Sequence, residues 1–344
     1  MTGTLKKLIW VLLVNLIFSY SLVYITYKRW DINKYPQDSP AYIALVENDI
    51  FHNDVGYRFK YRILTPLIVK SLLNFVPQID IEITAHLDRQ KKQIFYIFCW
   101  VNYVFVILTS VLLFLYAVKY YSISNHIAHI GSFFYLLSFH TLSNHLIPLV
   151  DAGACFFIIL LLIFEREKRW KWFGICAVLA VLQKEVVILV VLFILALEWL
   201  HHFSRRTIPY FFLLIPPVII YFVFKSLSPM PDNAAHQFAW AHYFKHLICF
   251  FQTNTYNTSF LTQNILPFCP LLAVFACHAG LYYKKFKVNY PLLNLLIIPG
   301  LAIVSVFFGV FGGNIGRVVS LGFPVYFIYE LKVLETVFRE IRIE

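Results

Sequence analysis

The chain alternates long apolar runs with short links that hold most of its charged residues. A helix needs about 20 apolar residues to cross the hydrocarbon core of a bilayer, and several of these runs reach that length. The pattern predicts an all-α fold, a polytopic transmembrane helix bundle of about ten spans, as a single integral membrane domain over residues 1–344. The runs are 8–27, 93–118, 127–139, 148–164, 170–182, 186–200, 209–227, 261–283, 291–311 and 318–334.

The composition supports residence in a membrane. Hydrophobic residues make up 60% of the chain and charged residues 14%. Soluble domains are about 45–50% apolar and about 25% charged, and a globule of this size cannot bury so much apolar surface. Lipid can solvate that surface on every side, and the abundant Phe and Tyr fit lipid-facing and interfacial positions.

The net charge of +11 raises the question of nucleic acid as a partner. The basic residues, however, stand in small groups between apolar runs, as the positive-inside rule describes for cytoplasmic links. We therefore expect both termini in the cytoplasm and no nucleic-acid partner. The basic groups are Lys119, then Arg166, Lys168, Arg169 and Lys171, then Arg205 and Arg206, then Lys284, Lys285 and Lys287, and finally Lys332, Arg339 and Arg342.

Two longer links fall on the opposite, extracytoplasmic side in this topology, at residues 28–92 and 228–260. Long loops are largely exempt from the charge rule, so the basic residues of the first loop do not contradict the orientation. Within the first loop, residues 41–48 and 63–75 have apolar residues at helical spacing. We expect two amphipathic helices there, lying on the membrane surface.

Several ionisable or polar residues stand at or inside the predicted membrane boundaries. Such residues are costly at membrane depth, so a functional site is the first hypothesis for them. The topology derived from loop charge alone places all of them on the extracytoplasmic side. They are Asp151 at the head of the fourth run, Lys184 and Glu185 between the fifth and sixth, Arg317 before the last, and His140, Asn144 and His145 before the fourth.

Each of these residues also has a structural explanation. Lys184 and Glu185 could form a local ion pair that closes a helical hairpin. Asp151 could cap its helix, and Arg317 could extend to the interface. His145 and its neighbours could be ordinary interfacial residues, and their spacing predicts no metal site.

The first loop holds a candidate base and candidate phosphate ligands. Asp38 precedes a helix, and a carboxylate there can take a proton from a hydroxyl group. Arg58, Lys60 and Arg62 alternate with aromatic residues, and Arg can hold a phosphate in a bidentate fork. The alternative is that Asp38 caps the helix and the cations contact lipid headgroups.

Together these residues resemble the GT-C-type glycosyltransferases, polytopic enzymes that use polyprenyl-linked sugar donors. The resemblance extends over nearly the whole chain, through short motifs in a common order. It rests on Asp38 with Tyr42, the string Arg62-Ile63-Leu64-Thr65-Pro66, Asp151 at the head of a span, Lys184-Glu185 at a hairpin, and Gly316-Arg317 before the last helix.

The sequence departs from that family in two ways. Many members carry paired acidic residues in the first loop, whereas Asp38 has no acidic neighbour and Asp31 lies seven positions upstream. No soluble outer domain follows the last apolar run, which is expected of a compact member from a bacterial inner membrane.

The resemblance implies an inverting transfer of a sugar from a polyprenyl phosphate to a hydroxyl group of a glycan, lipid or protein, outside the cytoplasm. Asp38 would take the proton of the acceptor. Arg62, Lys184 and Arg317 would hold the donor phosphate, while Asp151 and Glu185 would orient these cations or bind sugar hydroxyls. Tyr42, Arg58 and His145 complete the expected substrate site. Membrane lipids are the other expected partners, and no metal or cofactor is required.

Other classes of function fit parts of the pattern. A transporter or flippase for a lipid-linked sugar would need a polar path across the bilayer, often between internal repeats, and the sequence shows no repeat. A polymerase of lipid-linked glycans or a membrane acyltransferase fits nearly as well as a glycosyltransferase. A scaffold protein would not need ionisable residues at several helix ends.

Overall fold

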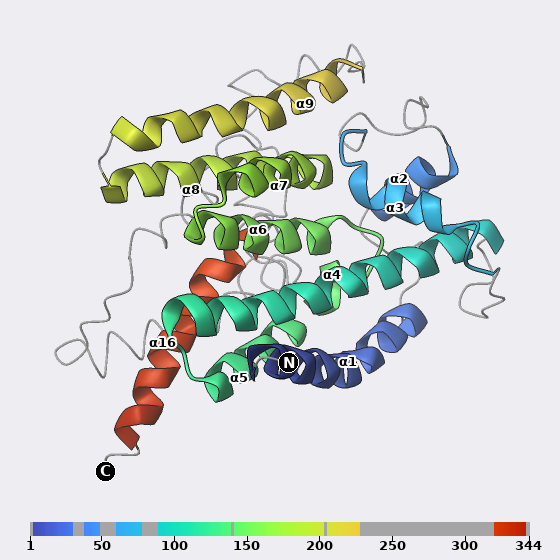
Figure 1. Ribbon diagram of the computed structural model, residues 1–344. Coiled ribbons are helices and arrows are strands. Elements are labelled where there is room, and N and C mark those ends of the chain that lie inside the picture. The colour runs from blue at the N-terminus through green and yellow to red at the C-terminus, as the bar shows by residue number, and fades with distance from the viewer. Residues whose placement is uncertain are drawn as a thin grey trace, which may run out of the picture.

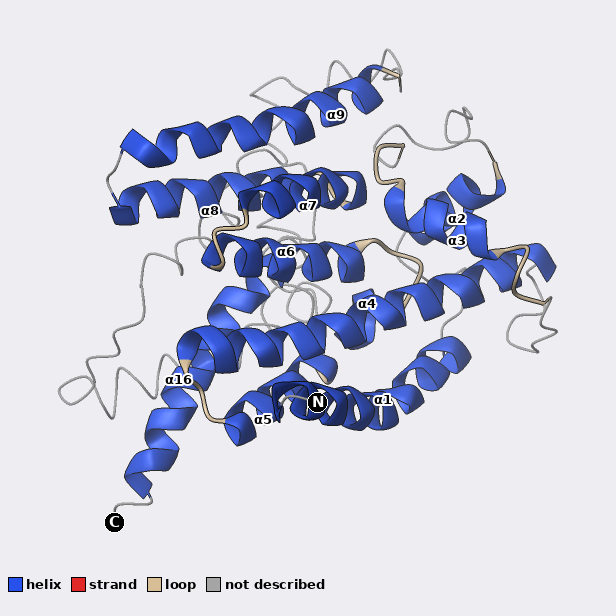
Figure 2. Ribbon diagram, viewed as in Figure 1, coloured by secondary structure: helices blue, strands red, loops and turns tan. Residues whose placement is uncertain are grey.

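The computed structural model describes most of the first two thirds of the chain and one C-terminal helix (Figure 1). Every regular element in this part is helical and none is a strand (Figure 2), which confirms the all-α prediction. The described residues are 3–29, 38–48, 60–77, 89–138, 141–202, 205–227 and 320–341. The predicted runs 261–283 and 291–311 lie outside them, as do the loop 228–260 and the residues Arg58, His140 and Arg317.

Two long helices, α1 (Gly3–Arg29) and α4 (Arg89–Tyr121), pack side by side (Figure 1). Side-chain hydrogen bonds join them inside the apolar interface: Asn15 Nδ2 donates to Ser110 Oγ at 2.8 Å, and the hydroxyls of Ser19 and Tyr103 lie 3.0 Å apart. Polar side chains commonly join helices in this way where lipid offers no other partner.

Within the described ranges, α4 is the one helix that is long and apolar enough to cross a membrane. Its 33 residues extend over about 50 Å. It includes the whole predicted run 93–118 and continues into the polar residues on both sides.

Four further helices follow in antiparallel succession: α5 (Asn125–Leu136), α6 (Asp151–Arg166), α7 (Trp170–Gln183) and α8 (Val187–His202). Helix α6 packs on both α4 and α7, and α16 (Phe323–Ile341) contacts α4, α5 and α6. The 14 residues of α7 extend over only about 21 Å, less than the roughly 30 Å of a hydrocarbon core.

The predicted run 209–227 is divided in two by its prolines. A 3-10 segment, Arg205–Leu214, precedes α9 (Ile215–Ser226), in which Pro216 and Pro217 occupy the first turn. Proline lacks the amide hydrogen that a helix interior needs but suits the first positions of a helix, so the α-helix begins there.

The two helices expected in the first loop are present, but they are not isolated on a surface. Helix α2 (Asp38–Glu47) begins three residues earlier than expected, and α3 is Leu64–Leu72. They pack on each other and on α4, and α3 also contacts α7. Tyr42, Leu45 and Val46 of α2 are buried. These contacts make α2 and α3 part of the bundle.

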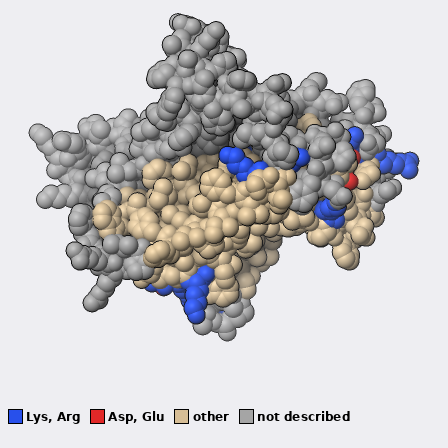
Figure 3. Space-filling model, turned by 90° about the horizontal axis from the view of Figure 1, so that it is seen from above, with Lys and Arg blue, Asp and Glu red and all other residues tan. Residues whose placement is uncertain are grey.

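The end of the bundle at the α6–α7 connection is rich in charge. Glu167 accepts hydrogen bonds from Lys119 and Tyr120 and pairs with Arg169, and Lys168 bonds Glu165 at 3.0 Å. The hydrogen bond from Lys119 is the main reason that the pKa of Glu167 lies below its ordinary value. On the face shown in Figure 3, Lys and Arg lie around the margin of a broad uncharged surface.

Candidate functional site

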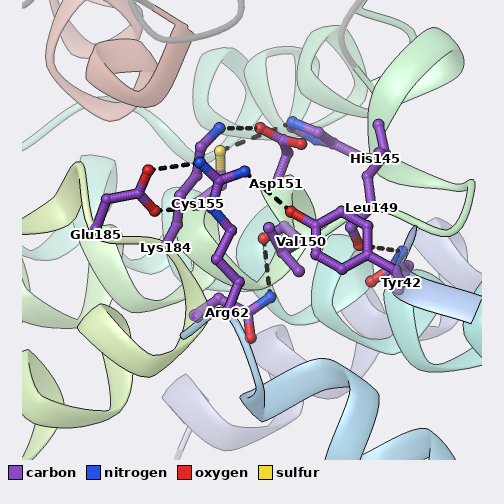
Figure 4. Close-up of polar contacts among 11 residues, drawn as sticks. Tyr42, Arg62, His145, Leu149, Val150, Asp151, Cys155, Lys184 and Glu185 are labelled. Carbon is purple, nitrogen blue, oxygen red and sulfur yellow. Dashed lines mark hydrogen bonds and ion pairs between the residues drawn. The ribbon is translucent and has the colours of Figure 1, made fainter. Parts of the chain in front are cut away.

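At the opposite end of α6 and α7, four segments bring charged and polar side chains together (Figure 4). They are helix α2, the residues just before α3, the start of α6, and the three-residue turn that joins α7 to α8. Asp151 is the first residue of α6, and Lys184 and Glu185 follow the end of α7. The predicted positions of these three residues at helix ends are therefore confirmed.

Arg62 joins three of these segments: its own, helix α2 and the turn after α7. Its Nε donates to Glu185 Oε2 at 2.8 Å and its Nη2 to Glu185 Oε1 at 2.5 Å, a bidentate fork. Its Nη1 donates to the hydroxyl of Tyr42 at 3.0 Å. Burial disfavours the Arg62 cation, but the neighbouring Glu185 carboxylate outweighs this and raises the pKa of Arg62 well above its ordinary value. The guanidinium is therefore a permanent cation.

Lys184 and Asp151 form a second ion pair directly beside the first. The ammonium group of Lys184 donates to Asp151 Oδ1. Asp151 lies in the first turn of α6, where the helix dipole also favours a carboxylate. The local pair between Lys184 and Glu185, considered as a structural alternative, is not the arrangement found. The two residues pair with distant segments instead, so this turn ties α6 and the segment before α3 together.

Two buried amides position the segment that leads to Asp151. Asn102 Nδ2 donates to the carbonyls of Ile147 and Leu149 at 2.5 and 3.0 Å. Gln183 Nε2 donates to the carbonyl of Val150 at 2.8 Å. These bonds satisfy carbonyls that precede the helix and would otherwise be buried without donors.

Gln183 also reaches the first loop. Its side-chain amide and the hydroxyl of Thr65 are in hydrogen-bond contact, with Thr65 Oγ1 lying 2.9 Å from Gln183 Oε1. Sequence patterns do not single out Asn102, Thr65 and Gln183 as site residues. The signal that could have found them is an uncharged polar side chain within or next to an apolar run, close to an ionisable residue.

His145 lies behind the ion pairs. It is buried at the end of a π-helical turn, Thr141–His145. Its Nδ1 lies 3.3 Å from the hydroxyl of Tyr135, and its Nε2 lies 3.8 Å from Cys155 Sγ. Cys155 is one turn after Asp151 on α6. His145 therefore lies next to the two ion pairs, with Cys155 of α6 as its contact. Its surroundings are aromatic and polar, with no exposed face.

Asp38 is on the same helix as a ligand of Arg62. It is the first residue of α2 and only partly buried. Tyr42 follows four positions later, and side chains at this spacing lie next to each other on a helix, with Cβ atoms about 5–6 Å apart. The neighbouring Ser39 is buried, and its hydroxyl has no hydrogen-bond partner within the described structure. The predicted base thus starts the helix that holds Arg62.

The described structure brings together Tyr42, Arg62, Asp151, Lys184 and Glu185, with His145 at the rear. Asp38 starts the helix that carries Tyr42. Arg58 and Arg317 lie outside the described residues. In the same part of the chain, no three His, Cys, Asp or Glu side chains gather as they would around a metal ion. The site is a group of balanced charges in which two cations face two carboxylates.

Such an arrangement can hold an anionic group. A guanidinium fork fits the oxygens of a carboxylate or a phosphate, and it delivers two parallel charge-assisted hydrogen bonds. The chain was compared with protein-family models, with curated proteins and with solved structures, and no match was found in any of the three.

Proposed function

We propose that this protein is a membrane glycosyltransferase that moves a sugar from a polyprenyl phosphate to an acceptor hydroxyl group. The observation that supports this most is that α2 contributes both the carboxylate of Asp38 and the hydroxyl of Tyr42, which holds Arg62. A base and a phosphate-binding cation on one rigid unit are what an inverting transfer needs.

In the proposed reaction, the acceptor oxygen attacks the anomeric carbon of the donor sugar as the bond from that carbon to the phosphate oxygen breaks. Asp38 takes the proton of the acceptor hydroxyl. Arg62 stabilises the negative charge that develops on the departing polyprenyl phosphate, because its hydrogen bonds strengthen as charge builds up. The sugar is joined to the acceptor with inversion at its anomeric carbon.

The remaining residues have supporting roles in this proposal. Lys184 and Asp151 hold the turn that carries Glu185, and Lys184 adds positive charge near the phosphate. Arg58 and Arg317 are further phosphate ligands, and His145 supports the rear of the site through Cys155. The proposed partners are the lipid-linked donor, membrane lipids, and a glycan, lipid or protein acceptor.

The proposal places the chain in a bacterial inner membrane as a bundle of about ten spans with cytoplasmic termini. Helix α4 and the recurring apolar runs support membrane residence. The basic group around Lys168 marks the cytoplasmic end of α6, so the site at Asp151 faces the extracytoplasmic side.

The test is transfer of radiolabelled sugar from polyprenyl phosphate to acceptors in membranes that contain the protein. Asp38→Asn is expected to reduce transfer by at least about a thousandfold, within the range that a general base contributes, without loss of folded protein. Glu47→Gln, at the other end of the same helix, is the matched control and keeps wild-type transfer.

Near-wild-type transfer by Asp38→Asn would remove Asp38 as the base. A flippase would give a different result in sealed vesicles: labelled donor would cross the bilayer with its sugar–phosphate bond intact. That outcome, without any transfer, would overturn the glycosyltransferase proposal.

A further inference from the structure

The two ion pairs of the site differ in how deeply they are buried. The side chains of Lys184 and Asp151 are 3% and 2% exposed, whereas those of Arg62 and Glu185 are 10% and 11% exposed. The Lys184–Asp151 pair is sealed from its surroundings. The Arg62–Glu185 pair is the more exposed of the two.

The carboxylate of Glu185 occupies the place that a phosphate would take on Arg62. Both of its oxygens accept hydrogen bonds from the fork of Nε and Nη2. Two oxygens of a phosphate group present the same geometry to that fork. Tyr42 bonds the third nitrogen, Nη1, and its side chain is fully buried, so it can keep Arg62 oriented when Glu185 is absent.

The backbone around Glu185 allows its side chain to leave without disturbing the turn. The amide of Val187 donates to the carbonyl of Lys184 at 3.1 Å, and the amide of Ile188 to the carbonyl of Glu185 at 3.0 Å. These bonds, together with the sealed pair of Lys184, hold the turn through atoms other than the Glu185 carboxylate.

We propose that Glu185 is a displaceable counter-ion, which a phosphate group on a lipid replaces at Arg62; this inference rests on the phosphate-binding role of Arg62 in the proposed function. Before binding, the carboxylate neutralises a cation that would be costly to leave unpaired in a largely buried place. After binding, the phosphate satisfies the same donors. A lipid without an anionic headgroup cannot compete for them, so the exchange also selects the ligand.

The exchange predicts that removing the charge of Glu185 strengthens phosphate binding. The experiment measures dissociation constants of purified protein in detergent by isothermal titration, with farnesyl phosphate, inorganic phosphate and farnesol as probes. Glu185→Gln keeps the shape of the side chain but no longer competes as an anion. We expect it to bind farnesyl phosphate about tenfold more tightly than wild type, the effect of removing one charge-assisted competitor.

Farnesol, which has no phosphate, is expected to bind wild type and Glu185→Gln equally. Tighter binding of inorganic phosphate as well would show that the site recognises the phosphate alone. Tighter binding of farnesyl phosphate only would show that the lipid chain is needed to deliver it. Both outcomes support the exchange. They differ in whether free phosphate or only a lipid-linked phosphate can replace Glu185.

The matched control is Glu167→Gln, which removes the same charge at the opposite end of α6. It is expected to leave the dissociation constant for farnesyl phosphate unchanged. If Glu167→Gln strengthens binding as much as Glu185→Gln, the effect comes from net charge and the proposal is wrong. Unchanged or weaker binding by Glu185→Gln also overturns it.

Folding of the variant is followed separately, because loss of the Glu185 carboxylate beside Arg62 can reduce stability. Farnesyl phosphate is expected to raise the melting temperature of Glu185→Gln more than that of wild type, since the ligand restores a partner to Arg62. An equal or smaller rise would count against the exchange. The binding result is independent of catalysis. Tighter binding of farnesyl phosphate, together with no sugar transfer in the activity assay, would support the counter-ion role of Glu185 and contradict the proposed glycosyltransferase activity.

Discussion

Gln183 connects the first loop to the bundle core through a single side chain. Its amide contacts Thr65 in the first turn of α3 and the carbonyl of Val150 just before α6. The Gln183 side chain is fully buried. It also packs directly against Gly153, in the first turn of α6. A Cβ atom at Gly153 would lie 2.3 Å from Gln183 Nε2 and 2.6 Å from its Cδ. Only glycine permits this approach between α6 and α7.

Gly153→Ala is therefore expected to destabilise the protein by about 1–3 kcal/mol, because Gln183 cannot move away without losing its hydrogen bonds. The control is Gly174→Ala on α7, where the nearest atom to the new Cβ, Leu213 Cδ2, is 3.3 Å away. That substitution is expected to be close to neutral. Thermal unfolding in detergent, followed by tryptophan fluorescence, measures both. Equal melting temperatures for the two variants would contradict the prediction.

At the scale of residues, the sequence predicts which side chains matter better than it predicts their partners. Asp151, Lys184 and Glu185 stand out because a charge beside an apolar run is costly. Their ion-pair partners cannot be predicted in the same way, because Arg62 lies 123 positions from Glu185 and no local pattern connects the two residues. Because Lys184 and Glu185 are adjacent in sequence, they suggest a local ion pair. The pairing of Glu185 with Arg62 instead depends on the packing of α3 against α7.

At the scale of elements, α6 ends with a residue in a left-handed conformation. Lys168 has φ = 55°, and the amide of Arg169 donates to the carbonyl of Phe164 at 2.9 Å, which closes the end of the helix. Glycine is the usual residue at this place because other residues pay a steric cost there. The Lys168 side chain offsets part of this cost by bonding Glu165 and lying 5.5 Å from the ring of Trp170.

Two substitutions separate the backbone contribution of Lys168 from that of its side chain. Lys168→Ala removes the contacts and keeps the strain, whereas Lys168→Gly removes both. We expect Lys168→Gly to be more stable than Lys168→Ala by about 1 kcal/mol, the reverse of their order inside a helix. Melting temperatures of the two purified variants test this. A more stable Lys168→Ala would show that the turn relaxes when the side chain is lost.

Element ends are predicted best where a charged residue marks them. Helix α6 starts at Asp151 and α7 ends just before Lys184, within three residues of the expected limits. The run 209–227 was expected to form one span because its apolar residues continue through Pro216 and Pro217. Hydropathy alone does not register the missing amide hydrogens that start α9 there.

At the scale of the whole molecule, the two charged ends of α6 and α7 are expected on opposite sides of a membrane. Reporter fusions that end at Arg169 and at Val186 test this directly. With the proposed orientation, the first reporter is cytoplasmic and the second extracytoplasmic. Reporters on the same side would show that α7, at about 21 Å, does not cross the bilayer. The fusions also decide which end faces the cytoplasm.

The tie between Arg62 and Glu185 also has a consequence for the order of synthesis. Arg62 leaves the ribosome 123 residues before its carboxylate partner, a delay of about 6 to 25 s at usual rates of translation. Asp151 likewise waits for Lys184. Until the turn after α7 emerges, Arg62 and Asp151 of the nascent chain lack these ion-pair partners. Biogenesis of this end of the bundle is therefore a late event, completed when a single pair of adjacent residues arrives and neutralises both charges together.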